Sequence, residues 1–368
     1  GAGTLSNASG SPVFLDQTDS ILHFISTGIV SGPVKLESGT LKSSGSPTIS
    51  GTMTQYNNAA IEVSVAQTLT YTGSPISLGA STLSLSGGGT FANTMSLVLD
   101  NAASKLLLSS ITVDNVSTSV DNSLGVEVEN DSTITSLSVA NITPVSIGSG
   151  KTLSGAIGVT AGSIKFIDTG TLASTVSLSG GTTLDADNSL TVSGALTQSG
   201  DITIDVLGNQ TLIYTGPSLS LGASTLSLSG GGTFANIMPL VLDNANSKLL
   251  LSSITVDKVS TSVDNSLGVV VDNDSTVRNF NLSEKLRLSV GSAQTLIITE
   301  PLIIPTAGME LAGSGKLELT DNLTMNGNVT LSSGSLTIDA TGLVLNLGGN
   351  LDLSGGTLLT DNTTYIHL

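Results

Sequence analysis

Apolar and polar residues alternate in short runs along almost the whole chain. Typical runs are Leu317-Glu318-Leu319, Leu323-Thr324-Met325 and Val329-Thr330-Leu331. An alternation with a period of two is typical of a strand whose successive side chains point to opposite faces, whereas apolar residues at helical spacing are almost absent. The sequence therefore predicts an all-β protein built from short strands.

The spacing of these runs predicts how the strands are arranged. A new run begins every six or seven residues, at 317, 323, 329 and 336, and groups such as Asp321-Asn322 and Asn326-Gly327-Asn328 separate them. These residue types suit tight corners, because they bond the local backbone or tolerate a positive φ. Three such strands make a coil, and coils stack about 4.8 Å apart with paired backbones. We therefore predict a right-handed parallel β-helix (a β-solenoid) of about 18 coils of about 20 residues, with stacked Leu, Val and Ile inside.

A pair of immunoglobulin-like sandwiches is the main alternative fold, because it also consists of many short strands. Sandwiches set their turns about 8–12 residues apart and usually bury a Trp or Tyr between two sheets. The turn signals here are closer together, and the chain has no Trp. The solenoid is therefore the favoured fold.

A long internal repeat supports the solenoid. Residues 71–133 match residues 214–276 at 54 of 63 positions, and the same offset of 143 residues relates 48–153 to 191–296. This offset equals seven coils of about 20.4 residues, so a duplicated block would re-enter the stack in register. Glu127 becomes Val270 in the second copy, which predicts an outward-facing position. We expect residues 1–368 to form one continuous solenoid and to be a segment of a longer protein, because neither end reads as a polar cap.

Composition and charge exclude several classes of function. The chain has no Cys, so disulfide scaffolds and thiolate metal sites are excluded. Its 28 acidic and 11 basic residues give a net charge of −17, which argues against a nucleic-acid partner. A mean hydropathy of +0.34 argues against disorder, yet no run approaches the about 18–20 apolar residues of a membrane helix.

Catalytic residues are not predicted. A hydroxyl nucleophile needs a positioned base, and the only histidines, His23 and His367, lie near opposite ends of the chain. We interpret both as incidental strand residues. Two distant histidines without Cys also make a zinc site implausible. The sequence therefore predicts no catalytic, cofactor-binding or metal-binding residue and no cofactor.

Acidic residues form the only clusters that could hold a cation or act as paired carboxylates. Their spacing of seven or eight residues indicates successive corners instead of one pocket, and the change of Asn115 to Lys258 argues against an essential ligand. We interpret them as turn residues, and the sequence leaves calcium binding at Glu129-Asn130-Asp131 open. The candidates are Asp114-Asn115, Asp121-Asn122, Glu129-Asn130-Asp131, Asp257-Lys258, Asp264-Asn265 and Asp272-Asn273-Asp274.

Aromatic and threonine patterns give no binding site either. Sugar-binding surfaces usually use aromatic platforms, and the four tyrosines are Tyr56, Tyr71, Tyr214 and Tyr365. Tyr71 and Tyr214 are equivalent in the repeat, which favours a shared structural position. An ice-binding face would need Thr-x-Thr once per coil, and runs such as Thr68-Leu69-Thr70 do not recur so regularly.

Two glycine-rich runs carry a resemblance to a known group of proteins. Residues 315–323 (GKLELTDNL) and 348–358 (GGNLDLSGGTL) are similar to the repeats of filamentous-haemagglutinin-type exoproteins and autotransporter passenger domains. The resemblance is one of pattern, covers most of the chain and carries over no functional residue. It implies an exported bacterial surface protein, often an adhesin.

These observations together give an expected function. We expect a non-enzymatic, extracellular structural or adhesive β-solenoid that forms a stalk, fibre or surface layer of a bacterial cell. Its partners would be a host or neighbouring-cell surface or matrix, or a second copy end to end, without nucleic acid and without a membrane span in this segment. A self-assembling filament subunit and a carbohydrate-active β-helix enzyme are the alternatives.

Overall fold

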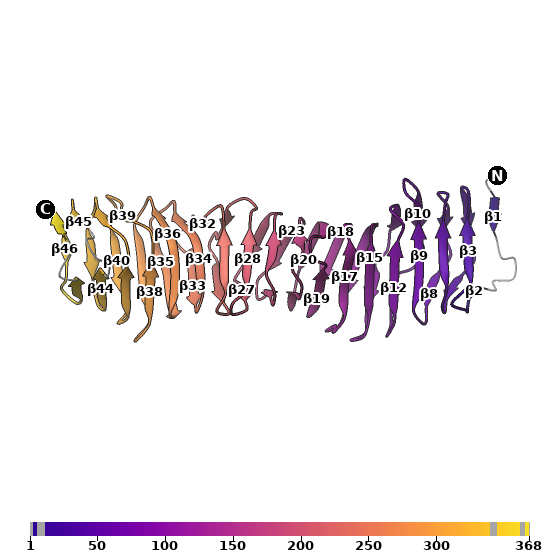
Figure 1. Ribbon diagram of the computed structural model, residues 1–368, viewed down its shortest axis with the longest axis horizontal. Helices are drawn as coiled ribbons and strands as arrows, with labels where there is room; N and C mark the ends of the chain where they lie inside the picture. The colour runs from indigo at the N-terminus through magenta and orange to yellow at the C-terminus, as the bar shows by residue number, and fades with distance from the viewer. Residues whose placement is uncertain (1–2, 6–11, 339–343, 361–364, 368) are drawn as a thin grey trace. The chain divides into compact units, whose positions relative to one another are not determined.

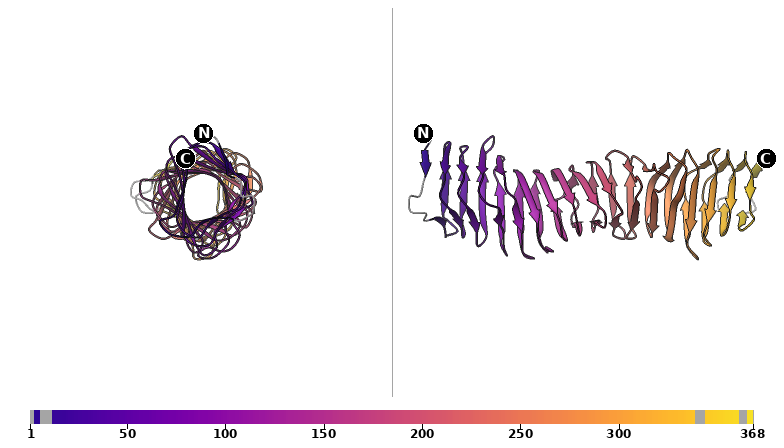
Figure 2. Two further views of the ribbon diagram at one scale, coloured as in Figure 1. Left: turned by 90° about the vertical axis from the view of Figure 1, so that its right-hand side faces the viewer. Right: turned by 180° about the vertical axis from the view of Figure 1, so that it is seen from behind.

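The computed structural model describes residues 3–5, 12–338, 344–360 and 365–367 (Figure 1). In these ranges all regular secondary structure is β-strand. The chain divides into two compact units, Gly1–Ser177 and Leu178–Leu368. Within each unit the strands of successive turns lie side by side and wind around an interior that side chains fill (Figure 2). Each unit is thus a parallel β-solenoid, as the strand spacing predicts.

The first unit has three strand positions in most turns, and strands at one position form one face. The first face contains β3 (Ile21–Phe24), β6 (Thr40–Ser43), β9 (Ala59–Val63), β12 (Thr82–Ser86), β15 (Lys105–Ser109), β17 (Gly125–Asn130), β19 (Thr143–Ile147) and β21 (Ser163–Phe166). The second contains β1 (Gly3–Leu5), β4 (Gly28–Val30), β7 (Thr48–Ile49), β10 (Thr68–Tyr71), β13 (Thr90–Asn93) and β22 (Thr171–Leu172). The third contains β2 (Val13–Leu15), β5 (Val34–Leu36), β8 (Met53–Gln55), β11 (Ile76–Ser77) and β14 (Leu97–Leu99), and the second and third faces share the long strands β16 (Thr112–Thr118), β18 (Ser132–Val139) and β20 (Thr152–Val159).

The second unit repeats this arrangement after β23 (Thr175–Ser179), which spans the boundary. Its first face contains β24 (Thr183–Ala186), β27 (Ile202–Val206), β30 (Thr225–Ser229), β33 (Lys248–Ser252), β35 (Asn265–Asn273), β37 (Leu286–Val290), β40 (Met309–Ala312), β43 (Val329–Leu331) and β46 (Leu351–Asp352). The second contains β25 (Leu190–Val192), β28 (Thr211–Tyr214), β31 (Thr233–Asn236), β38 (Thr295–Ile298), β41 (Lys316–Leu319), β44 (Ser335–Ile338) and β47 (Thr357–Thr360). The third contains β26 (Leu196–Ser199), β29 (Leu219–Ser220), β32 (Leu240–Leu242), β39 (Leu302–Ile304), β42 (Leu323–Met325), β45 (Val344–Leu347) and β48 (Tyr365–His367), with β34 (Thr255–Thr261) and β36 (Ser275–Leu282) shared.

The register of the strands sets the length of each turn. Strands on one face pair in parallel, and the paired residues lie 19 positions apart for Val126 and Val145 but 24 apart for Ala59 and Leu83. The described residues form about 16 turns of about 21 residues, where the sequence predicted about 18 of about 20. The turns are longer than predicted because some corners contain extra residues, such as the one around Ala66, which has a positive φ of 60°.

Aliphatic side chains form the columns that the alternation predicts. On the first face of the first unit, Leu41, Ile61, Leu85, Leu108 and Val128 occupy consecutive turns in register, and all are buried. The intervening residues face outward and are partly exposed, as in β12, where buried and half-buried positions alternate. Burial of one such aliphatic side chain stabilises the fold by about 1.5–3 kcal/mol. Consecutive coils therefore share a continuous apolar core.

The repeat is structural as well as sequential. β12 and β30 have the same offset of 143 residues, and so do β13 and β31, β15 and β33, and β16 and β34. Glu127 faces outward as predicted, because its side chain is 36% exposed, and its carboxylate lies 2.5 Å from Lys105 Nζ. The parallel pairing shows that the immunoglobulin-like alternative is wrong. That residues 1–368 form one continuous solenoid stays a prediction.

Candidate functional site

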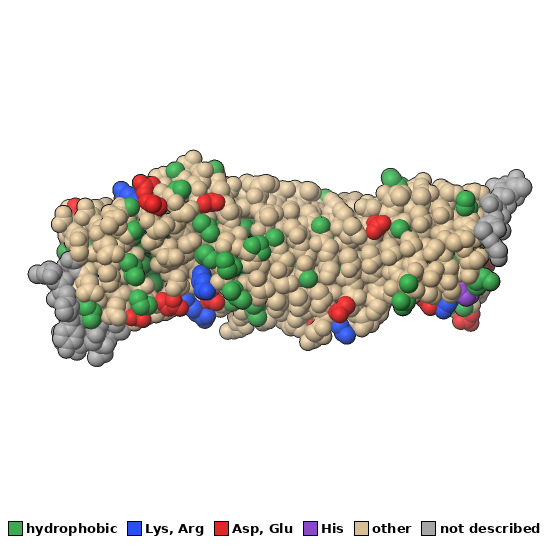
Figure 3. Space-filling model, turned by 90° about the horizontal axis from the view of Figure 1, so that it is seen from above, with side chains coloured by type: hydrophobic (Ala, Val, Ile, Leu, Met, Phe, Trp, Pro, Cys, Tyr) green, Lys and Arg blue, Asp and Glu red, His purple; other side chains and the backbone are tan. Residues whose placement is uncertain are grey.

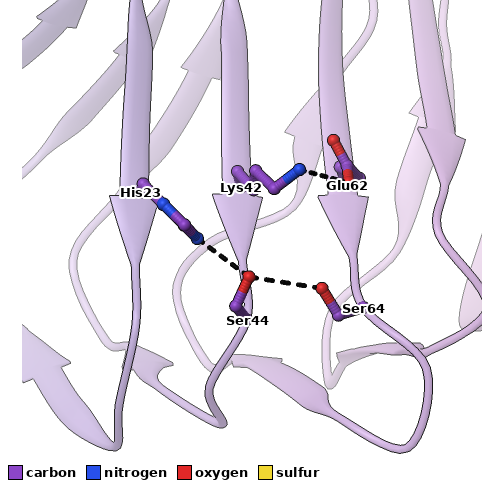
Figure 4. A network of polar contacts seen from close by, with 5 residues as sticks. All are labelled: His23, Lys42, Ser44, Glu62 and Ser64. Atoms are coloured by element: carbon purple, nitrogen blue, oxygen red, sulfur yellow. Dashed lines mark hydrogen bonds and ion pairs between the residues drawn. The ribbon is translucent and has the colours of Figure 1, made fainter.

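His23 belongs to a network of polar contacts across three turns (Figure 4). Its Nε2 lies 2.8 Å from Oγ of Ser44, and that oxygen lies 3.3 Å from Oγ of Ser64. Beside this network, Lys42 Nζ donates to Glu62 Oε1 at 2.6 Å. No local sequence pattern pairs His23 with Ser44, because only the register of β3 with β6 brings them together.

A serine within hydrogen-bond distance of a histidine is the first requirement of a hydroxyl nucleophile, but the other requirements are missing around Ser44. The backbone N–H groups of Ser44 and Gly45 both donate to the Phe24 carbonyl, so neither is directed at an oxyanion. Within the described part of the chain no carboxylate contacts His23. The contact is therefore a polar bridge between turns. His367 belongs to β48 in the second unit, and its side chain lies outside the described residues.

The acidic candidates cap the backbone of the following turn. Asp131 Oδ1 accepts the Thr152 N–H at 2.9 Å, and its equivalent Asp274 accepts the Thr295 N–H at 2.7 Å. Asp121 does the same for Ile142 at 3.0 Å. Each of these bonds links residues 21 positions apart, which is one turn of the solenoid. The structure thus places these carboxylates at successive corners, in agreement with their interpretation as turn residues.

Three further acidic candidates, Asp114, Asp257 and Asp264, also have separate partners. Asp114 accepts from the Thr135 hydroxyl at 3.1 Å, Asp257 lies 2.8 Å from Arg278, and Asp264 accepts the Lys285 N–H at 3.2 Å. Among the residues with described positions, no three His, Asp or Glu side chains gather closely enough to hold a metal ion. In the segment Glu129-Asn130-Asp131, the Asn130 amide donates to the Ser109 hydroxyl at 2.9 Å.

Tyr71 and Tyr214 occupy the shared structural position that the repeat predicts. Both are buried, and their hydroxyls accept a backbone N–H from Met53 and Leu196 at 3.0 and 3.2 Å. The Tyr71 hydroxyl also donates to the Ser74 carbonyl at 2.6 Å. Burial raises the pKa of both phenols above its usual value. Neither tyrosine is a surface platform for a ligand.

Two of the four tyrosines lie elsewhere. Tyr56 is 54% exposed, and the Lys35 ammonium lies 5.5 Å from its ring centroid and 5.0 Å from that of Phe14. The side chain of Tyr365 lies outside the described residues. The structure thus offers one exposed aromatic pair with a cation between its rings.

A pair of equivalent polar grooves, one in each copy of the repeat, is the strongest candidate site. The groove of the first unit has a volume of about 320 Å³ and that of the second about 280 Å³. Each lies where the first face meets the second. We call them groove 1, lined by Gly88, Gly89, Ser110, Ile111, Thr112, Asp131, Ser132, Thr133, Thr152 and Ser154, and groove 2, lined by Gly231, Gly232, Ser253, Ile254, Thr255, Asp274, Ser275 and Thr276.

An outward column of threonines leads into each groove, where Thr112 and Thr133 line groove 1 and Thr255 and Thr276 line groove 2. In the first unit Thr68, Thr90, Thr112 and Thr133 are paired in register on four successive turns. In the second unit the column consists of Thr211, Thr233, Thr255 and Thr276. These side chains are partly exposed, and in the described residues none of their hydroxyls has a protein hydrogen-bond partner. The column therefore offers a row of free donors and acceptors.

The corner that precedes the threonines makes the groove hollow. Gly88 has a φ of +80° and donates its N–H to the Ser110 carbonyl at 2.6 Å, while Ser110 itself has a φ of 55°. A Cβ at Gly89 would lie 2.5 Å from the Ser64 carbonyl oxygen, so only glycine fits there. Two glycines and a left-handed serine therefore bring the backbone close together and leave no large side chain over the column.

A third cavity of about 320 Å³ in the second unit has a different character. It is lined by Asp264, Asn265, Ser266, Lys285, Arg287 and Glu310, and Arg287 lies 3.7 Å from Glu310. In the first copy Ile142 and Pro144 stand at the positions of Lys285 and Arg287. This charged cavity is therefore specific to the second copy.

The Thr-x-Thr pattern does not predict the grooves, because it requires two threonines per strand. The column uses one threonine per turn, and the second outward position holds Thr70, Ala92 and Asp114 on successive turns. Hydroxyls therefore form one column instead of the flat double array that Thr-x-Thr would give. In the sequence, the column could be recognised from the corner residues before each threonine. It could also be recognised from the spacing of 21 or 22 residues between Thr68, Thr90, Thr112 and Thr133.

Comparisons with known proteins assign this chain to no family. Neither models of protein families nor curated proteins nor solved structures give a significant match to this chain. Across its described residues the structure contains no helix that is long and apolar enough to cross a membrane.

Proposed function

We propose that this chain is a non-enzymatic, extracellular structural or adhesive β-solenoid, part of a stalk, fibre or surface layer of a bacterial cell. The observation that supports this most is the continuous stack of aliphatic columns and parallel backbone ladders in each unit, built without Cys. Each turn contacts mainly its neighbours, so stability grows as turns are added. Such a stack is suited to extending a surface away from a cell.

Composition and charge fit this role. Backbone and side chains that are neither hydrophobic nor charged dominate the face drawn in Figure 3, where charged side chains form only a few small groups. The net charge of −17 opposes non-specific association of neighbouring molecules and disfavours nucleic acid. The resemblance of the glycine-rich runs to filamentous-haemagglutinin-type and autotransporter passenger repeats supports export and adhesion. A host or neighbouring-cell surface or matrix would be the partner.

Binding without turnover is the better proposal for the grooves. Glycoside hydrolysis uses a pair of carboxylates about 5–10 Å apart on the two sides of the scissile bond. Each groove is lined by a single carboxylate, Asp131 or Asp274, and its Oδ1 is already bonded to a backbone N–H. A carbohydrate-active enzyme is therefore less well supported than an adhesive surface.

Surface exposure on intact cells tests the proposal. Cells that make the protein would be treated with a protease that does not enter them, and the chain would be followed with an antibody before and after permeabilisation. We expect cleavage and antibody labelling on intact cells, while a cytoplasmic control protein stays intact. Labelling that appears only after permeabilisation would contradict the proposal.

A further inference from the structure

Every residue that lines groove 2 has an identical equivalent in the lining of groove 1. The eight positions from Gly231 to Thr276 are identical to those from Gly88 to Thr133, although nearby positions differ, as Asn115 and Lys258 do. Building on the proposed adhesive function, we propose that each groove binds a stretch of an extended neutral polysaccharide chain. The grooves would thus be two equivalent glycan-binding sites on one chain.

The chemistry of the lining selects a neutral, hydroxyl-rich ligand. No Lys or Arg lines either groove, and the net charge of −17 repels polyanions. Threonine hydroxyls both donate and accept hydrogen bonds, which matches sugar hydroxyls that do the same. The threonine methyl groups give apolar contact beside each hydroxyl. Nucleic acids and acidic glycans fit this lining poorly.

The geometry selects a chain instead of a small molecule. The threonine column follows the stacking direction of its unit, with neighbouring side chains about 4.8 Å apart. The two column threonines in each groove span about 5 Å, and the two that continue the column beyond the groove extend the row to about 14 Å. The volume of groove 1, about 320 Å³, lies at the low end of the range for ligand sites, about 300–1,000 Å³, and that of groove 2, about 280 Å³, lies just below it. Shallow grooves of this size, without an aromatic platform, would hold a polymer through several weak contacts along its length.

Asp131 and Asp274 position an acceptor at the edge of the grooves. The N–H groups of Thr152 and Thr295 bind Oδ1 of these carboxylates at 2.9 and 2.7 Å. That bond fixes the orientation of each carboxylate and leaves Oδ2 to accept from a sugar hydroxyl. A carboxylate acceptor bonds more strongly than a neutral one, so it would add directionality to the binding.

Two grooves on one chain should act together on a polymer. Linking two weak sites raises apparent affinity without any new contact when one ligand molecule can reach both. A long polysaccharide should therefore be retained better than its own short oligosaccharides.

Affinity electrophoresis of the purified chain in gels with neutral polysaccharides, such as β-glucan, xylan, mannan and dextran, tests the proposal. The variants are Thr112→Val with Thr133→Val for groove 1, Thr255→Val with Thr276→Val for groove 2, and all four together. Valine keeps the size and strand preference of threonine and removes the hydroxyl. The matched control is Thr183→Val with Thr203→Val, an outward pair in register on the first face that lines neither groove.

We expect at least one neutral polysaccharide to retard the wild-type chain, each double variant to weaken its binding at least fivefold, and the quadruple variant to abolish it. The control pair should bind like the wild type, and circular dichroism should be the same for all variants. No retardation by any neutral polysaccharide would overturn the proposal. So would equal loss in the control pair, binding only to acidic polysaccharides, or thermal hysteresis in ice that depends on the same threonines.

The two proposals fail differently. A chain that is exposed on intact cells but binds no neutral polysaccharide would contradict the grooves as glycan sites and leave the structural surface role intact. A chain that binds glycan through its threonines but is found only inside cells would contradict the surface role and leave the grooves assigned.

Discussion

At the scale of single residues, the two buried tyrosines combine apolar packing with defined hydrogen bonds. Tyr71 stacks on Phe91 with 6.4 Å between ring centroids, and Tyr214 stacks on Phe234 at 6.1 Å. Each phenol also accepts the N–H of a buried residue, Met53 or Leu196, and donates to a carbonyl in the exposed corner that follows its strand. The repeat predicted that the two tyrosines are equivalent, but their hydrogen bonds depend on the corner after each strand and could not be derived from the spacing.

Removing either phenol hydroxyl should destabilise the protein. Tyr71→Phe leaves the Met53 N–H and the Ser74 carbonyl without their partner, and an unsatisfied buried group costs about 1–3 kcal/mol. Tyr214→Phe should cost a similar amount. Urea denaturation measures both losses. Tyr56→Phe is the control, because that ring is half exposed, and a shift as large as that of Tyr71→Phe would contradict the role of burial.

Alkaline pH should destabilise the protein through the same residues. Because the folded pKa of Tyr71 and Tyr214 is raised, the unfolded chain loses these protons first as pH rises. Their contribution to stability is therefore complete below the unfolded tyrosine pKa of about 10 and is lost as pH rises from there through the folded pKa. The free energy of unfolding measured from pH 9 to 12 should fall. This free energy should fall less steeply with pH in the variant that combines Tyr71→Phe with Tyr214→Phe. Equal slopes for this variant and the unmodified protein would contradict the explanation.

At the scale of elements, strands follow from the alternation, while corners decide the register. The runs at 317–319, 323–325 and 329–331 were all predicted as strands and correspond to β41, β42 and β43. Turn length was predicted less well, since a corner residue adds to the turn without changing the alternation. The grooves depend on that register, so they could not be predicted from local patterns alone.

Glycine corners should tolerate substitution very differently. Gly125 and Gly79 both have a positive φ, of 63° and 54°, but a Cβ at Gly125 would lie 1.9 Å from the Pro144 carbonyl oxygen, whereas one at Gly79 would meet nothing within 4 Å. Gly79→Ala should therefore cost only the backbone strain of about 1–2 kcal/mol.

Gly125→Ala must also separate two turns, and we expect a loss of about 4 kcal/mol or more. The equivalent Gly268 has the same contact, 1.8 Å from the Arg287 carbonyl oxygen, and provides a second measurement in the other unit. Thermal or urea unfolding of the three variants compares them directly. Equal losses for Gly79→Ala and Gly125→Ala would show that the turns are not packed as closely as described.

At the scale of the whole molecule, duplication and charge are the two properties that the sequence showed most directly. The same side-chain contacts occur in both copies, for example Asn122 Nδ2 to the Asn101 carbonyl and Asn265 Nδ2 to the Asn244 carbonyl, both at 2.8 Å. Differences between copies are concentrated on outward positions. The copies therefore share a core and grooves, while surfaces such as the cavity around Lys285 have diverged.

The net charge of −17 should make both stability and association depend on salt. Basic residues are too few to pair with every carboxylate, and the pairs that form, such as Arg278 with Asp257, are partly exposed and worth about 0–1 kcal/mol each. Raising NaCl from about 0.01 M to 1 M shortens the screening length from about 30 Å to about 3 Å. The unfolding midpoint and the apparent size by light scattering should both rise, because self-repulsion within and between molecules weakens. Calcium and magnesium at matched ionic strength should act equally, whereas a rise specific to calcium that is lost in Asp131→Asn would instead indicate a site at Glu129-Asn130-Asp131.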